Sequence, residues 1–284
     1  RCRRSPIILV NQHLSPHIPS QVATPIAPGG EKDRDCFWKG NQRMAEYDRQ
    51  TLGARAGSAL AIDEGLRSYM LRVYNYMGLG LVVTGLVAFF TSQWAMSSPA
   101  NAELLYGSPL SWVIMLSPLA FVLVLSFGIN KLSVGASQAI FWAFAAVMGL
   151  SLSSIFLVYT GASIAKVFFI TAATFGAMSL YGYTTKRDLP GLGSFMFMGL
   201  IGIIIASIVN MFLQSSAMHF VISVIGVLVF VGLTAYDTQK IKNLYSEVDS
   251  ADTATKKAIM GALTLYLDFI NLFLMLLRLF GQRR

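Results

Sequence analysis

Charged residues are missing from long stretches of this chain, and that absence constrains its fold more than any other feature. Between Asp188 and Asp237, 48 consecutive residues contain no Asp, Glu, Lys or Arg, and no acidic residue falls between Glu103 and Asp188. Charged residues make up 13% of the chain, about half the share of about 25% that soluble domains carry. Uncharged apolar runs of about 20 residues suit lipid rather than water. The sequence therefore predicts an integral membrane protein.

Seven apolar runs follow one another along the chain, and each is long enough to cross a bilayer. A helix needs about 20 residues to span a hydrocarbon core of about 30 Å. Turn signals separate the runs, such as Asp188-Leu189-Pro190-Gly191. We therefore predict an all-α fold, a seven-transmembrane-helix bundle within residues 69–284. The runs cover residues 70–92, 109–130, 134–160, 162–183, 192–214, 217–240 and 257–280.

The start of the chain has a different composition. Residues 1–43 contain seven Lys or Arg, both cysteines (Cys2 and Cys36) and five of the nine prolines, and the first methionine is Met44. The simplest interpretation is that residues 1–43 are a non-native extension; the alternative is a disordered basic tail. Residues 44–68 are expected to be a cytosolic lead-in. No cysteine follows residue 43, so thiol chemistry is not expected in the membrane domain.

Basic residues in short loops indicate the orientation, because such loops stay in the cytosol. The loops on the less basic side hold Glu103, Lys166 and His219, so we predict a cytosolic N-terminus. A full span over 257–280 would place Arg278 outside, against this rule; the alternative is a partly re-entrant last helix, and we favour the full span. The basic residues near the expected cytosolic ends are Arg55, Arg67, Arg72, Lys131, Lys186, Arg187, Lys240, Lys242, Lys256 and Lys257.

Two acidic residues, Asp237 and Asp268, lie inside apolar runs. A charged residue at membrane depth costs about 2.5–3.5 kcal/mol even on insertion scales, so such residues are expected to serve a function. The loop between the last two runs lies midway between the two aspartates, which places them at similar depth. If they meet, both cannot easily ionise, and a shared proton would hold the helices together. The alternative is that each aspartate separately meets a Lys, a helix cap or interfacial water.

Other polar residues extend the aspartate face of the last run. Thr264, Asn271 and Arg278 lie on the same helical face as Asp268 and could line a polar path or form hydrogen bonds between helices. Tyr236 and Tyr266 are expected to pack or to lie at interfaces. The sequence has no HExxH, GxSxG, P-loop or dinucleotide-binding glycine pattern, so no enzyme and no cofactor is predicted. The basic residues border membrane spans, which does not favour nucleic-acid binding.

The segments around the two aspartates resemble a known family. Ala235-Tyr236-Asp237-Thr238-Gln239 and Leu265-Tyr266-Leu267-Asp268-Phe269-Ile270-Asn271-Leu272-Phe273, with Leu276-Leu277-Arg278, closely resemble the transmembrane Bax inhibitor motif family (Bax inhibitor-1 group) in its bacterial branch. The similarity covers about residues 65–284. It implies a protein of the bacterial cytoplasmic (inner) membrane with seven helices, the last of them central.

The resemblance also implies a function. Members act as pH-sensitive calcium leaks, and their paired aspartates, which match Asp237 and Asp268, are the pH sensor. Calcium would be the permeant ion, held transiently by these two residues, because a tight calcium site needs more oxygen ligands. Some bacterial members bind and restrain a membrane-anchored AAA protease, which is the alternative function. Some relatives carry an acid in the second helix and arginines at its cytosolic end; here Lys131 is an imperfect substitute for those arginines.

Two further classes of protein compete with this interpretation. Intramembrane aspartyl proteases also carry a Tyr-Asp pair and a second aspartate within Gly-x-Gly-Asp, but the second site here reads Leu265-Tyr266-Leu267-Asp268, without either glycine. A proton-coupled transporter would also use intramembrane acids. It would need a substrate pocket, for which the sequence gives no sign.

Overall fold

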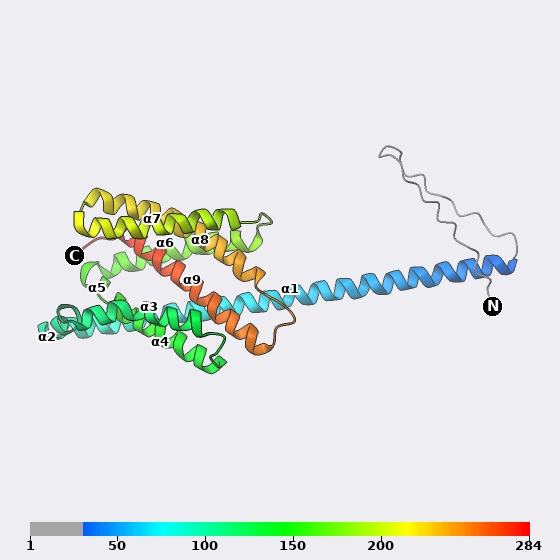
Figure 1. The fold of residues 1–284 in the computed structure, drawn as a ribbon, viewed down its shortest axis with the longest axis horizontal. Coiled ribbons are helices and arrows are strands. Elements are labelled where there is room, and N and C mark those ends of the chain that lie inside the picture. The colour runs from blue at the N-terminus through cyan, green and yellow to red at the C-terminus, as the bar shows by residue number, and fades with distance from the viewer. Residues whose placement is uncertain (1–30) are drawn as a thin grey trace. The chain divides into compact units, whose positions relative to one another are not determined.

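A computed structural model describes the backbone of residues 31–284 and the side chains of residues 64–284. Within the described backbone the long elements are helices, joined by short turns (Figure 1). Residues 64–284 form one compact unit. The helices are α1 (Glu31–Met96), α2 (Pro99–Ala102), the π-helical turn η1 (Glu103–Gly107), α3 (Leu110–Gly128), α4 (Val134–Leu152), α5 (Ile155–Val158), α6 (Gly161–Thr184), α7 (Pro190–Leu213), α8 (Ser216–Asn243) and α9 (Ala251–Phe280).

Seven segments within residues 64–284 are long and apolar enough to span a membrane, which confirms the predicted fold class. They match the seven apolar runs with boundaries shifted by a few residues. The expectation for residues 1–43 lies largely outside the described residues, and the backbone of the lead-in 44–68 is helical. The segments are Glu64–Met96, Leu110–Gly128, Val134–Val158, Gly161–Thr184, Pro190–Leu213, Ser216–Asn243 and Ala251–Phe280.

Hydroxyl side chains mark where several of these helices begin. Ser133, Thr160, Ser215 and Ser250 precede α4, α6, α8 and α9, and each side chain accepts a hydrogen bond from a backbone N–H of the first turn. The first N–H groups of a helix have no partner within the helix, so such caps satisfy them. The helix starts are therefore encoded locally in the sequence.

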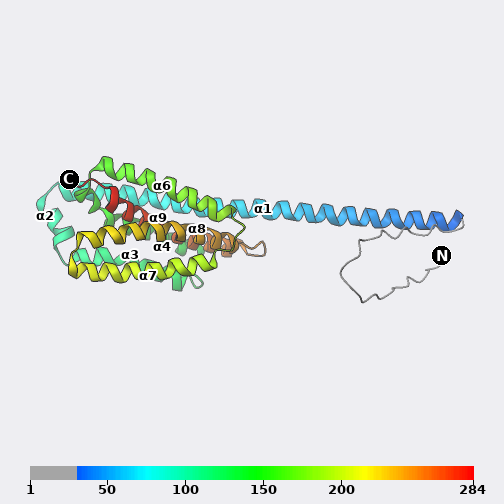
Figure 2. The ribbon, with the colours of Figure 1, turned by 90° about the horizontal axis from the view of Figure 1, so that it is seen from above.

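The last helix, α9, is the most extensively packed of the spans. In its most apolar window 72% of the residues are buried, against 11–44% in the other six. It contacts α4, α6 and α8 (Figures 1 and 2). Its 30 residues correspond to about 45 Å of helix, enough for a full crossing. The central position implied by the family resemblance stays a prediction.

The C-terminal end of α9 is tied to neighbouring segments. After the helix ends, the backbone of Gln282 accepts a hydrogen bond from the Thr160 N–H, and its own N–H donates to Ser163 Oγ. The Arg284 N–H donates to the Val158 carbonyl. These bonds join the chain after α9 to the turn between α5 and α6.

A proline inside α3 is accommodated by serines. Pro118 has no N–H, so the carbonyl of Ile114, one turn earlier, loses its helical partner. Ser151 Oγ of α4 donates to this carbonyl at 2.6 Å, and Ser117 Oγ donates to it at 2.9 Å. In lipid every such group must be satisfied within the protein, so these serines allow the proline and join α3 to α4.

Helices α6 and α8 approach each other closely at a glycine. A Cβ atom added to Gly182 of α6 would overlap the backbone carbonyl of Ala235 in α8. Small residues at helix contacts let backbones come together where no hydrophobic effect drives association in lipid. Gly182 therefore sets the distance between α6 and the part of α8 that carries Asp237.

We expect Gly182→Ala to destabilise the bundle by about 1–3 kcal/mol, because backbone atoms cannot move aside as a flexible side chain can. The measurement is reversible unfolding of the purified protein in mixed micelles. Gly176→Ala is the matched control on the same helix, since its added Cβ would meet no atom within 4 Å. Equal stability of the two variants would contradict this account of the α6–α8 contact.

Candidate functional site

Helices α7, α8 and α9 line an open cavity of about 710 Å³ within the membrane-spanning region. Apolar side chains form most of its wall, and its polar residues come from all three helices. They include Asp237 of α8 and three residues of the predicted polar face of α9, namely Thr264, Asp268 and Asn271. We call this space the aspartate cavity.

The structure brings Asp237 and Asp268 together. Both side chains line the aspartate cavity, with their carboxyl groups in contact, and the equal spacing from the α8–α9 loop accounts for their similar depth. Asp268 is 6% exposed, and its Oδ2 is buried without a hydrogen-bond partner among the described residues. Two ionised carboxylates can only accept hydrogen bonds, so a proton on one of them would turn this contact into a bond.

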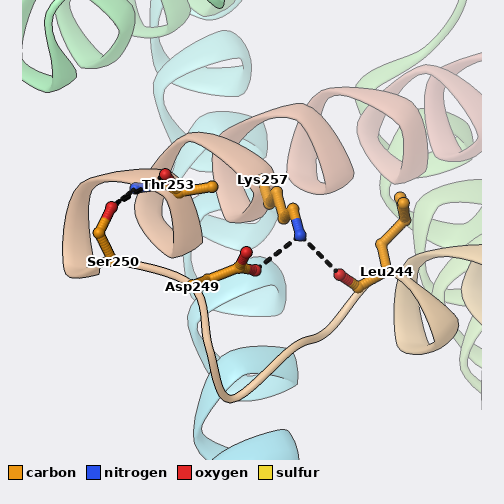
Figure 3. A network of polar contacts seen from close by, with 5 residues as sticks. All are labelled: Leu244, Asp249, Ser250, Thr253 and Lys257. Atoms are coloured by element: carbon orange, nitrogen blue, oxygen red, sulfur yellow. Dashed lines mark hydrogen bonds and ion pairs between the residues drawn. The ribbon is translucent and has the colours of Figure 1, made fainter.

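The loop between α8 and α9 holds the two helices in register (Figure 3). The Lys257 ammonium donates to Asp249 Oδ2 at 2.6 Å and to the Leu244 carbonyl at 3.1 Å. Ser250 caps α9 by accepting a hydrogen bond from the Thr253 N–H. One lysine thus joins the end of α8, the loop and the first turns of α9, which keeps the two aspartates at the same depth.

Hydroxyl groups close to each aspartate in the chain connect α8 and α9 to other helices. In α9, the Tyr266 hydroxyl lies 2.7 Å from Thr84 Oγ1 of α1, and Thr84 in turn donates to the Ala145 carbonyl of α4. In α8, Thr238 Oγ1 lies 3.0 Å from Ser179 Oγ of α6, which lies 2.6 Å from the Tyr74 hydroxyl of α1. These contacts fix the rotation of α8 and α9 about their axes.

The sequence predicts no specific partner for Tyr266 or for Thr238. Tyr266 does pack, with its ring edge-on to Phe144 at 5.2 Å between centroids. Its hydroxyl partner lies 182 residues away in the chain, so no local pattern could reveal it. The signal available in the sequence was a hydroxyl one or two residues from each aspartate.

A second cavity, of about 420 Å³, adjoins the first on the side of the α8–α9 loop. Asp237, Lys240 and Thr264 line both cavities. The second cavity also borders Lys256 and Lys257, so we call it the lysine cavity. Lys240 Nζ lies 5.9 Å from the centre of the Tyr236 ring. The boundary between the cavities therefore carries one acid and one base.

Two residues predicted to support the site lie elsewhere. Arg278 is exposed near the far end of α9 and lines neither cavity. Lys131 is exposed as well, although its neighbours Ile129 and Asn130 border the lysine cavity. Helical spacing placed Arg278 on the same face as Asn271, but two turns further along, beyond the end of the aspartate cavity.

The site offers few ligands for a resident metal ion. Among residues 64–284, no group of three or more His, Cys, Asp or Glu side chains is close enough to hold one. Calcium takes six to eight oxygen ligands, so two aspartates would need hydroxyl, amide and water oxygens to complete its shell. Thr264 and Asn271 supply such oxygens in the same cavity.

Comparison with known proteins places the chain in a family. The family model described as Bax1-I, inhibitor of apoptosis-promoting Bax1, matches residues 66–284. This chain belongs to that family. The matched residues include both aspartates, and the match confirms the family resemblance that their motifs indicated.

Relatives within the family extend over most of the chain. "Inner membrane protein YbhL" of Escherichia coli strain K12 is 53% identical over 233 residues, which cover 81% of this chain and 98% of that protein. RP147 of Rickettsia prowazekii is 50% identical over 222 residues, covering 78% of this chain and 92% of that protein. A Streptococcus pyogenes membrane protein, SpyM3_0260, is 39% identical over 224 residues, covering 78% and 95%. With its apolar helices, this family member is an integral inner membrane protein.

We expect the Tyr266–Thr84 contact to contribute measurably to stability. Thr84 Oγ1 donates to carbonyl oxygens, so the Tyr266 hydroxyl is the donor between the two. Tyr266→Phe should cost about 0.5–1.5 kcal/mol, and Thr84→Val about 1–3 kcal/mol because it leaves the tyrosine hydroxyl buried and unbonded.

The two variants and their combination form a double-mutant cycle, measured by unfolding in mixed micelles. We expect a coupling energy of at least about 0.5 kcal/mol. Tyr181→Phe, at an exposed position of α6, is the control and should change little. Simple additivity of the two single effects would contradict a direct bond between these residues.

Proposed function

We propose that this family member is a pH-sensitive calcium leak channel of the inner membrane, gated by Asp237 and Asp268. The observation that carries the proposal is the facing pair of carboxyl groups in the aspartate cavity, one of them buried with an unbonded oxygen. Calcium is the permeant ion, no cofactor is required, and the protein is not an enzyme. Family membership supports this choice over a protease or a transporter.

The gating step follows from the chemistry of two carboxyl groups in contact. When they share a proton, a hydrogen bond joins α8 to α9 and the pair carries one negative charge. When that proton leaves, two like charges face each other and repel. The helices then separate at this point, and the doubled negative charge attracts a divalent cation. Flux therefore rises with pH.

The path proposed for the ion uses both cavities. An ion in the aspartate cavity passes Asp237, Lys240 and Thr264 to reach the lysine cavity, which borders the α8–α9 loop. That loop is basic, as are the other loops at this end, so we assign it to the cytosol together with the N-terminus. Under this assignment calcium enters the cytosol past Lys240.

We expect Asp237→Asn and Asp268→Asn to abolish the pH dependence of calcium flux. Asparagine keeps the shape and the hydrogen bonding of the side chain but cannot release a proton. The measurement is calcium entry into sealed liposomes that contain purified protein, from about pH 6 to about pH 8. If opening requires the release of one proton, the calcium flux of the parent changes by at most about tenfold per pH unit.

Asp188→Asn serves as the control, because Asp188 is an exposed acid in the loop between α6 and α7. This variant should behave like the parent. A parent flux no greater than that of protein-free liposomes at any pH would contradict the leak. Co-purification of a membrane-anchored AAA protease would then favour the alternative, a regulator of that protease.

We expect Lys240→Gln to increase calcium flux at the upper end of the pH range, where the gate is open. Lys240 is a fixed positive charge at the boundary of the two cavities, and it repels an entering cation. Removing about 1 kcal/mol of repulsion would raise the flux about fivefold.

Lys242→Gln is the matched control for this measurement. Lys242 lies two residues away, but its ammonium donates to the Tyr183 carbonyl and lies over the Tyr183 ring, away from both cavities. Its substitution should leave the flux unchanged. A flux in Lys240→Gln at or below that of the parent would show that Lys240 does not oppose the ion.

A further inference from the structure

A groove of about 450 Å³ lies between α1 and α6, apart from both cavities of the candidate site. Its walls are mostly apolar, with Met70 and Leu71 from α1 and Phe175 and Leu180 from α6. Gly176 opens the wall on α6, because no atom lies within 4 Å of the position where its Cβ would be. The shape and the chemistry of this groove suit a hydrocarbon chain.

A polar pocket of about 530 Å³ adjoins the groove on α1. It contains Arg67, Arg72, Ser68 and Asn75, together with one acid, Glu64. Arg67 and Leu71 line both the pocket and the groove, so the two spaces meet along one side of α1. Two guanidinium groups against one carboxylate leave this pocket with net positive charge.

We propose that an anionic phospholipid of the surrounding bilayer binds at this place, with its phosphate at Arg67 and Arg72 and an acyl chain in the groove. Arginine presents paired N–H donors that match the oxygens of a phosphate. The arginines lie at the basic end of the spans, where anionic headgroups gather beside positively charged residues. One molecule with a charged head and an apolar tail satisfies both halves of the site.

The groove also borders the side chains that connect α8 to α6 and α1. Tyr74 and Ser179 line it, and Ser179 Oγ contacts Thr238 Oγ1, which adjoins Asp237 in the chain. A lipid in the groove therefore packs against the side chains that fix α8. The binding proposal itself does not depend on ion conduction.

The test is native mass spectrometry of the full chain, purified in detergent and titrated with phosphatidylglycerol or phosphatidylcholine. We expect the parent to bind phosphatidylglycerol more tightly. Arg67→Gln should weaken binding of phosphatidylglycerol about fivefold, the factor expected for one basic residue at an anionic surface, and leave phosphatidylcholine unchanged. Arg67→Lys should keep most of the preference.

Gly176→Leu tests the groove, because the larger side chain fills it and should weaken binding of both lipids. Gly202→Leu is its matched control, since Gly202 is an open, exposed glycine of α7 that lines neither space. Arg187→Gln, at an exposed arginine in the loop between α6 and α7, is the control for charge. Both controls should bind as the parent does.

Three outcomes would overturn the proposal. The first is equal binding of the two lipids by the parent. The second is an unchanged preference in Arg67→Gln. The third is a dimer that Gly176→Leu disrupts while lipid binding stays the same, which would make a second copy of the chain the occupant of the groove.

Discussion

A polar group in the hydrocarbon layer must find its partner inside the protein, because lipid offers none. The bundle follows this constraint at several places where its backbone or a hydroxyl would otherwise be left without a bond. Ser151 and Ser117 satisfy the carbonyl freed by Pro118, and Thr84 links Tyr266 to a carbonyl of α4. The contacts between helices therefore include specific hydrogen bonds, in addition to the packing of small residues.

Within residues 64–284, the Oδ2 atom of Asp268 is one of three buried side-chain atoms without a hydrogen-bond partner, together with the Tyr69 hydroxyl and Asn210 Nδ2. Asp268 lies in the aspartate cavity, where the hydroxyls of Thr264 and Ser194 donate to backbone carbonyls of their own helices. An unsatisfied acceptor in such a place is costly unless a proton or an ion can reach it. The aspartate cavity provides the space, and it adjoins the lysine cavity, which borders the α8–α9 loop.

Much of the fold could be predicted, because hydropathy and length determine which segments cross a bilayer. The similar depth of Asp237 and Asp268 also followed from the sequence, since a short loop fixes the relative depth of two antiparallel helices, whereas the sequence left open whether the two side chains meet. The contacts of Thr84, Ser179 and Gly182 could not be predicted. They depend on how distant helices rotate and how closely they approach, and helical periodicity describes only one helix at a time. For the same reason Arg278 matched the face of α9 but lies away from the cavity.

The hydrogen bonds at the two ends of α9 have a mechanical consequence. Lys257 holds its first turns to the α8–α9 loop, and the backbone of Gln282 and Arg284 holds the chain beyond its last turn to the segment around Thr160. A rod fixed at both ends cannot slide along its axis, but its middle can bow. Asp268 lies in that middle. Displacement of the aspartate pair therefore requires curvature of α9, and the stiffness of the helix near Asp268 sets the work needed to part the two carboxyl groups.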